Sequence, residues 1–267
     1  MSTFENFFRL SVASLLRDRL LYLLFSLALL ALLLIPAFSM FSLRQVQELS
    51  VTLCLSALSF LLLVVTVLTG ASSIWRDVEK RYTSAVLGLP VSRAAFVLGK
   101  FCAIALLLAV IAAVFGLGSA AAIKIAAASY PPDIPVRWDN FIAAVAFDYL
   151  KCVMLLSLAF LFSAVSTSFY FPFLGAIAIY LAGSASQDVY EMTIGAYGQT
   201  LVPLSRTVIK GVYYLLPNFS AFNLKAQAIY ALPLAPVTML LTVLYFVCYT
   251  GIILSIAVWS FSRRELP

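Results

Sequence analysis

The sequence predicts an all-α integral membrane protein with six transmembrane helices, on the evidence of its composition and of where the apolar residues lie. Hydrophobic residues make up 64% of the 267 residues and charged residues 10%, against about 45–50% and 25% in an ordinary soluble domain. The mean hydropathy is +1.07, and a soluble fold of this size could not bury so much apolar surface. We therefore expect one transmembrane domain over residues 1–267.

Six apolar runs approach or exceed the roughly 20 residues that a helix needs to cross the hydrocarbon core. The fifth is the shortest, because Gln187 and Asp188 end it, and the even count places both chain ends on one side of the membrane. The predicted crossings are residues 20–41, 51–74, 101–128, 141–168, 171–186 and 237–261.

The basic residues predict the orientation of these crossings. Of the 17 Lys and Arg residues, ten lie before the first crossing, after the last, or in the loop over residues 75–100. Four lie on the opposite side, and three lie in the long segment before the last crossing. Since cytoplasmic loops of membrane proteins are enriched in Lys and Arg, we expect both termini and this loop in the cytoplasm.

Two segments outside the crossings are predicted to lie at the membrane surface. In residues 1–19, aromatic and leucine side chains alternate with polar and basic ones, which is typical of an amphipathic helix in the cytoplasmic interface. Residues 187–236 are too polar to cross and too apolar to form a soluble domain. We expect short interfacial or re-entrant helices there on the outer face, since irregular backbone at membrane depth must be buried by protein or line a cavity.

Within this outer segment, residues 200–216 have helical spacing, with Arg206 and Lys210 one turn apart on one face. Pro217 and Asn218 are expected to end that helix. These four residues are the outer candidates for a functional role.

The fourth crossing contains Asp148 and Lys151, which are three residues apart and therefore on one helical face. A charge at the bilayer centre costs about 2.5–3.5 kcal/mol on insertion scales and less near an interface. The pair is either an ion or proton site, or a structural feature: a neutralised pair at the outer interface, or the end of an amphipathic lead-in helix from Trp138. Its place near the start of the crossing favours a structural role.

The cytoplasmic loop over residues 75–100 is predicted to form a short helix that stops and is followed by the start of a new helix. Pro90 cannot continue a helix, and the Ser92 side chain can cap the next one. A compact amphipathic tip of this kind suits docking into a groove on a soluble partner, although a solvated connector fits the composition equally well. The candidate contact residues are Glu79, Arg81, Val86, Leu87, Leu89, Pro90, Ser92 and Arg93.

The sequence offers no catalytic constellation. It has no histidine, which is the commonest general base and metal ligand. It contains no Walker, GxGxxG, HExxH or GxSxG motif, and its four cysteines are not at metal-binding spacing. We therefore expect no enzyme, no metal and no cofactor bound by this chain.

The loop resembles the first cytoplasmic loop of the permease subunits of type-2 ATP-binding cassette (ABC) transporters. Glu79, Leu87, the run 90–93 and the pair 99–100 match that pattern, while Tyr82 stands where a threonine is usual. Residues 216–223 are similar to the outer segment of the branch that includes copper-enzyme maturation permeases. Residues 261–265 resemble the family's usual ending.

The resemblance implies one half of a permease dimer, completed by a second copy or a homologous permease, in a bacterial inner (cytoplasmic) membrane. Residues 1–19 would be the elbow helix and the Glu79–Ser92 region the coupling helix, which contacts a separate ABC ATPase subunit holding ATP and Mg. The expected function is transport, by export, of an unidentified substrate. The alternatives are an ion-gradient-driven carrier or channel with Asp148 or Lys151 as its ionisable site, and a membrane accessory protein that does not transport.

Overall fold

The computed structural model describes residues 3–41, 45–79, 92–129, 135–195 and 203–263. In this part of the chain the regular structure is entirely helical, which confirms the predicted fold class. The elements are α1 (Thr3–Leu15), α2 (Arg19–Ser39), α3 (Val46–Glu79), α5 (Arg93–Ser129), α6 (Trp138–Val165), α7 (Tyr170–Ile194), α8 (Pro203–Leu215), η2 (Ser220–Phe222), α9 (Lys225–Ile229) and α10 (Pro236–Arg263).

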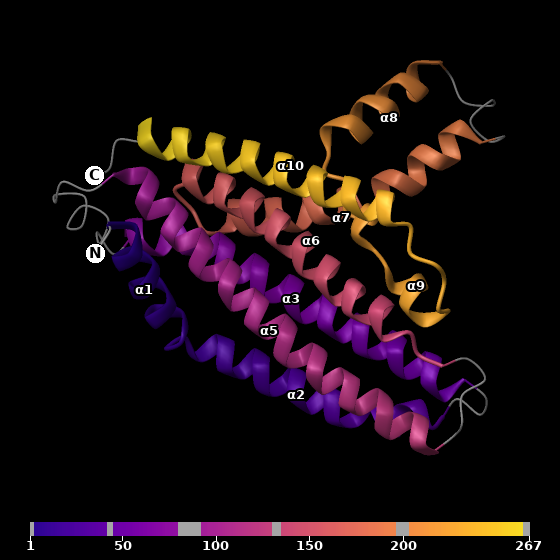
Figure 1. Ribbon diagram of the computed structural model, residues 1–267. Coiled ribbons are helices and arrows are strands. Elements are labelled where there is room, and N and C mark those ends of the chain that lie inside the picture. The colour runs from indigo at the N-terminus through magenta and orange to yellow at the C-terminus, as the bar shows by residue number, and fades with distance from the viewer. Residues whose placement is uncertain (1–2, 42–44, 80–91, 130–134, 196–202, 264–267) are drawn as a thin grey trace.

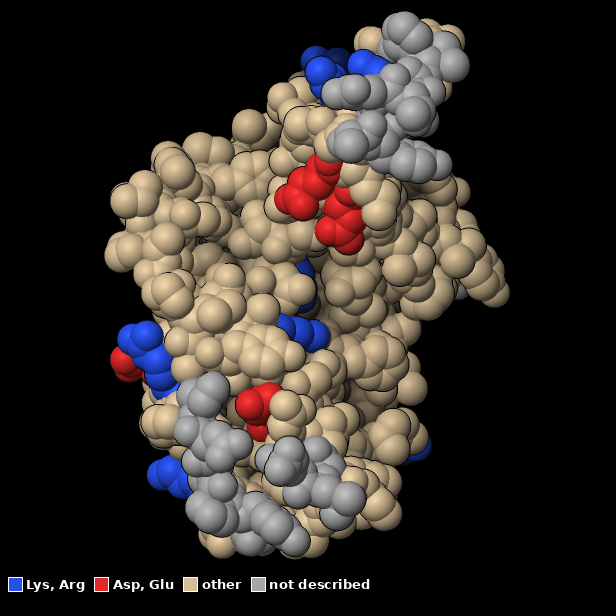
Figure 2. Space-filling view, turned by 90° about the vertical axis from the view of Figure 1, so that its right-hand side faces the viewer, with Lys and Arg blue, Asp and Glu red and all other residues tan. Residues whose placement is uncertain are grey.

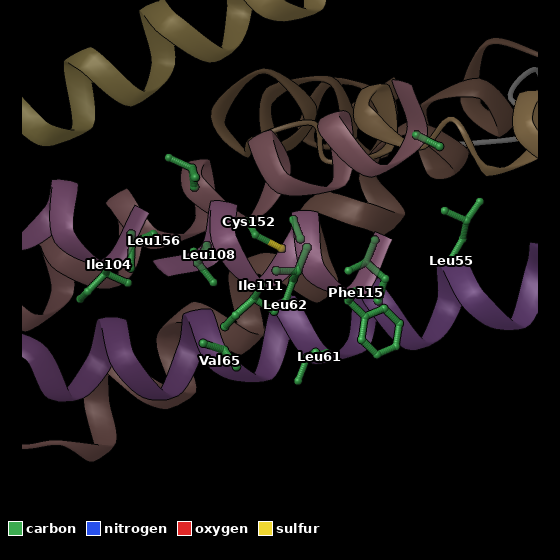
Figure 3. Close-up of a cluster of buried hydrophobic side chains, with 14 of the residues drawn as sticks. Leu55, Leu61, Leu62, Val65, Ile104, Leu108, Ile111, Phe115, Cys152 and Leu156 are labelled. Carbon is green, nitrogen blue, oxygen red and sulfur yellow. The ribbon is translucent and has the colours of Figure 1, made fainter. Parts of the chain in front are cut away.

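The long helices form one bundle, with α6 in contact with α3, α5, α7 and α10 (Figure 1). Helix α2 covers α3 and α5 on one side of the bundle. The core lies where α3, α5 and α6 meet, and its side chains are mostly branched aliphatics, with phenylalanine rings and the thiols of Cys54 and Cys152 among them (Figure 3). They include Leu55, Leu61, Leu62, Val65, Ile104, Leu108, Ile111, Phe115, Cys152 and Leu156.

Five of the six predicted crossings coincide with helices that are long and apolar enough to span a membrane: α2, α3, α5, α6 and α10. In α2 and α10 only 11% and 17% of the most apolar window is buried, against 67% in α6. The two helices therefore present most of their apolar surface to the outside of the bundle, where lipid satisfies it.

The predicted fifth crossing, 171–186, lies within α7, whose 25 residues exceed the length needed to cross. It is less apolar than the other five because its second half contains serine and glutamine. Its beginning lies beside the inner part of α3, where the rings of Phe169 and Trp75 are 5.7 Å apart. Its far part reaches the start of α10 through Gln187, Asn218 and Tyr245. Helix α7 thus starts beside α3, and its far end projects from the bundle next to α8 (Figure 1).

The N-terminal segment predicted as an interfacial helix forms α1, which packs against α5. Helix α1 ends at Leu15, and α2 begins at Arg19 after a turn. The Asp18 side chain caps α2 by accepting a hydrogen bond from the Leu20 amide at 3.0 Å. The predicted helix over residues 1–19 is therefore shorter than expected and is separated from the first crossing by a defined cap.

Asp148 and Lys151 form the predicted neutralised pair, and they face the interior of the bundle; their depth in the membrane stays a prediction. Helix α6 begins at Trp138, so Asp148 lies about 15 Å along it at 1.5 Å per residue. The side chains of Asp148 and Lys151 are only 3% and 8% exposed. The pair is neutralised as expected, but inside the bundle, because the neighbouring helices α3 and α7 cover this face of α6.

Candidate functional site

The site is built from the helix ends that flank the predicted coupling loop. Arg81, Val86, Leu87, Leu89 and Pro90 lie outside the described residues, so their predicted role in docking stays a prediction. Glu79 is the last residue of α3, and Ser92 and Arg93 lead into α5. We call the surrounding set the inner junction: Phe7, Asp18, Ser73, Arg76, Ser92, Arg93, Phe96, Lys100, Phe261 and Ser262.

The start of α5 is fixed by a side-chain cap and by the end of α10. The Ser92 hydroxyl accepts a hydrogen bond from the Ala95 amide at 3.3 Å, which confirms the predicted capping role. The guanidinium of Arg93 donates to the Ser262 carbonyl at 2.8 Å. Carbonyls in the last turn of a helix lack helical donors and carry partial negative charge, so they favour a cation. Arg93 therefore holds the first residue of α5 against the last turn of α10.

Aromatic rings join three helices one turn further along α5. Phe96 is buried and stacks on Phe261 of α10 with ring centroids 5.9 Å apart. It also meets Phe7 of α1 edge to face at 5.5 Å. The Lys100 ammonium lies 5.5 Å from the centre of the Phe96 ring, within cation–π range. Phe96 is thus the common contact of α1, α5 and α10.

The end of α3 is bound to the same assembly by polar contacts. Arg76 forms an ion pair with Asp18 at 3.1 Å, using the carboxylate oxygen that does not cap α2. The Lys100 ammonium donates to the Ser73 carbonyl. Asp18 and Arg76 are 20% and 42% exposed, so we expect this pair to fix geometry more than it adds stability.

A polar cavity of about 50 Å³ lies behind these contacts, between α1, α3 and α5. It is large enough to hold water, and its hydroxyl, carboxylate and cationic groups can bind it. Buried water of this kind lets two packed surfaces shift without leaving polar groups unpaired. The lining residues are Ser11, Ser14, Leu15, Asp18, Thr69, Ser72, Ser73, Arg76, Lys100 and Ile104.

Together these contacts make the inner junction a mechanical joint. The two helices that enter and leave the predicted coupling loop, α3 and α5, are each bonded to another helix: α3 to the turn before α2, and α5 to α1 and α10. The described residues on either side of the predicted docking loop are therefore connected to several helices of the bundle.

The outer candidates form a second assembly around Asn218. Its backbone amide donates to the Tyr245 hydroxyl at 3.0 Å, and its side chain donates to Gln187 at 3.0 Å and to Tyr213 at 3.4 Å. Its side-chain oxygen accepts from the Ala221 amide at 3.2 Å. Asn218 therefore bonds α7, α8, η2 and α10 together, and its functional role stays a prediction.

Pro217 and the two basic candidates have different surroundings. The Pro217 carbonyl lies so close to Gly183 of α7 that a Cβ there would come within 2.4 Å of it, so this approach requires glycine. Arg206 and Lys210 lie one turn apart on α8, as predicted, and Lys210 is exposed. Helix α8 extends away from the bundle beside the end of α7 (Figure 1), and the rings of Tyr190 and Tyr213 stack between these two helices with centroids 4.1 Å apart.

Comparison with known proteins gives one match. The sequence fits the family model described as "ABC-2 family transporter protein" over residues 12–266. That range includes α2 to α10, the predicted coupling loop and both assemblies apart from Phe7. A search of curated proteins found no significant match.

Proposed function

Because this chain belongs to the ABC-2 family of transporter proteins, we propose that it is an export permease driven by ATP hydrolysis on a separate ATPase subunit. The family and the apolar helices make it a multi-pass membrane protein and a permease subunit of an ABC transporter. The proposal also includes the direction of transport, which is export, and a location in a bacterial inner membrane with both termini in the cytoplasm. It further includes a permease dimer that moves a substrate not yet identified. Any kinship with copper-enzyme maturation permeases rests on residues 216–223 alone.

The observation that supports this proposal is the inner junction. A permease without its own nucleotide site must receive mechanical work from a partner through its cytoplasmic surface. The loop over residues 80–91 offers the contact, and the junction distributes the displacement from α3 and α5 to α1, α2 and α10. An accessory protein that does not transport would have no need to connect so many helices to one loop.

The energy required is within reach of such a partner. Moving a two-state element from 1:99 to 99:1 takes about 5.5 kcal/mol of differential binding. Two ATPase subunits that close around ATP and Mg, each docked on one permease half, supply that difference by binding one arrangement of the loops more tightly than the other. No step of the chemistry falls on this chain, whose role is to change its packing.

Capture of the partner tests the proposal. The tagged chain would be purified in mild detergent, with Leu87→Asp beside the wild type and Ser205→Asp, an equal added charge on the exposed face of α8, as the matched control. We expect a P-loop ATPase with the wild type and with Ser205→Asp, and its loss with Leu87→Asp, because a charge in the apolar seat prevents docking. Equal recovery with all three would reject the loop as the docking site. No ATPase with any of them, in a folded protein, would favour the ion-gradient-driven carrier.

A further inference from the structure

The middle of the bundle contains a set of charged and polar groups that the proposed coupling does not use. One carboxylate oxygen of Asp148 accepts a hydrogen bond from the Lys151 ammonium, and the other accepts from the Ser59 hydroxyl of α3. Lys225 is half-buried at the start of α9, and α9 packs on both α3 and α6. We call Ser59, Asp148, Lys151 and Lys225 the buried charge cluster, although only the first three are fully buried.

Stability does not explain this cluster. Desolvating a buried ion pair costs as much as its attraction returns, or more, and apolar residues of similar volume are usually at least as stable. Within a membrane protein, ionisable side chains that face the bundle interior mark substrate or ion pathways. The pair lies at the start of the most completely buried stretch of α6, which runs without interruption from Lys151 to Phe160. A chemical role is therefore the better explanation.

The cluster has an excess of positive charge. The Asn140 amide donates to the Gln227 carbonyl at 2.7 Å and holds α9 on α6, with Lys225 on the same short helix. Burial lowers the pKa of the Lys225 ammonium, Lys151 lowers it further and Asp148 raises it. Among the described residues, Asp148 is the one carboxylate that acts on Lys225. Two cations therefore share a single anion.

The cluster also has hydrogen-bond donors to spare. An ammonium has three N–H groups, and Lys151 gives one of them to Asp148. Within the described ranges, no second acceptor is found for Lys151, and the half-buried Lys225 side chain has no protein acceptor. Both oxygens of Asp148, in contrast, already have partners. A further acceptor would therefore have to come from outside these groups, and a single negative charge would balance the cluster.

We propose that the buried charge cluster binds a singly charged anionic group, a phosphodiester or a carboxylate, of the molecule that the permease moves. This rests on the proposed transport function, and it assigns the substrate class for that function. Figure 2 looks onto the end of the molecule that carries α8 and α9, and it shows basic side chains in a recess near the middle of that face. An anion reaching Lys225 and Lys151 from this side would complete the cluster and neutralise it.

A phosphodiester could belong to a lipid headgroup or to a soluble molecule, and the test separates the two. The full chain would be purified without the ATPase in an uncharged detergent, and its Tm followed against three probes. Dimethyl phosphate represents the free anion, dihexanoyl phosphatidylglycerol the anionic lipid, and dihexanoyl phosphatidylcholine the lipid without net charge. A ligand that binds the folded state raises the Tm in a saturable manner.

We expect phosphatidylglycerol, dimethyl phosphate or both to raise the Tm, and phosphatidylcholine to have less effect. Lys225→Met removes the excess charge without breaking the Asp148–Lys151 pair, and it should weaken the apparent affinity at least about tenfold. Lys225→Arg should preserve the affinity. The control is Lys124→Met, a lysine whose ammonium lies over Trp138. It should change the affinity less than about twofold, because distant charges are screened.

The paired variant Asp148→Asn with Lys151→Met provides a second test, because it leaves no unpaired buried charge. We expect its Tm, too, not to rise with the anionic probes. Equal responses in the wild type, Lys225→Met and the paired variant would overturn the proposal, as would equal effects of the anionic and zwitterionic lipids. A response to phosphatidylglycerol alone identifies a lipid, whereas a response to dimethyl phosphate shows that a soluble anion suffices. Because the Tm measurements contain no ATPase, the absence of an anion effect would not contradict the coupling proposal. Failure to capture an ATPase, in turn, would not contradict anion binding.

Discussion

Phe96→Leu is predicted to loosen the inner junction while keeping the site apolar. The substitution removes the ring that stacks on Phe261 and meets Phe7, and it removes the face that lies beside Lys100. Each aromatic pair is worth about 0.5–1.5 kcal/mol beyond its buried area, and an exposed cation–π contact about 0.5–1 kcal/mol. The expected loss in free energy of unfolding is therefore about 1.5–4 kcal/mol.

The assay has two readouts. Unfolding of the purified chain in mixed micelles gives the stability change, and ATPase stimulation in the assembled complex gives the coupling change. The matched control is Phe60→Leu, because Phe60 is 69% exposed on the outside of α3 and should cost little in lipid or detergent. Equal unfolding free energies for the two variants would refute the reasoning. A stability loss with unimpaired ATPase stimulation would show that Phe96 is a packing residue and not part of the joint.

Two further substitutions test the contact between α3 and α6. Gly70→Ala would place a Cβ 2.8 Å from the Cβ of a residue on α6 and should lower the free energy of unfolding by about 1–3 kcal/mol. Gly251→Ala has open space around it and should stabilise its helix by about 0.5–1 kcal/mol. Equal changes in the free energy of unfolding would contradict the close approach. Ser59→Ala removes a donor to the Asp148 carboxylate and should destabilise by about 1.5–3 kcal/mol, against little change for the exposed Ser56→Ala. An unchanged free energy of unfolding for Ser59→Ala would mean that this hydrogen bond does not hold the helices together.

Much of the fold could be predicted because lipid imposes simple requirements on sequence. A helix must be long enough and apolar enough to cross, so five crossings could be identified from run lengths alone. The helix containing Arg206 and Lys210 was predictable from spacing and from the proline that follows it, and α8 confirms it. The cap by Ser92 was predictable for a similar local reason.

The contacts that make the inner junction could not be predicted, because they join residues far apart in the chain. Asp18 and Arg76 are separated by 58 positions, and Arg93 and Ser262 by 169. The sequence does contain one overlooked signal: Asp18 lies two positions before the start of the first apolar run at Leu20, and aspartate is a typical N-cap residue. A capping carboxylate beside the cytoplasmic loop is a natural partner for an arginine there.

The burial of the Asp148–Lys151 pair inside the bundle could not be predicted for a different reason. Helix α6 begins at Trp138, as a lead-in helix to the fourth crossing would, but position along an apolar run does not show which helices cover a side chain. Ser59 of α3 lies 89 positions from Asp148, and no local pattern marks it among the serines of that helix.

Helix α3 connects the two regions to which function has been assigned. It is continuous from Val46 to Glu79, and about 25 Å of it separates Arg76 at the inner junction from Ser59 in the buried charge cluster. Between them, Gly70 lets α3 approach α6 so closely that a Cβ at this position would lie 2.8 Å from the Cβ of Ala159. Because packed interiors transmit strain, we expect a displacement that arrives at Arg76 to move α3 and α6 together and to carry the Ser59–Asp148–Lys151 contacts with it.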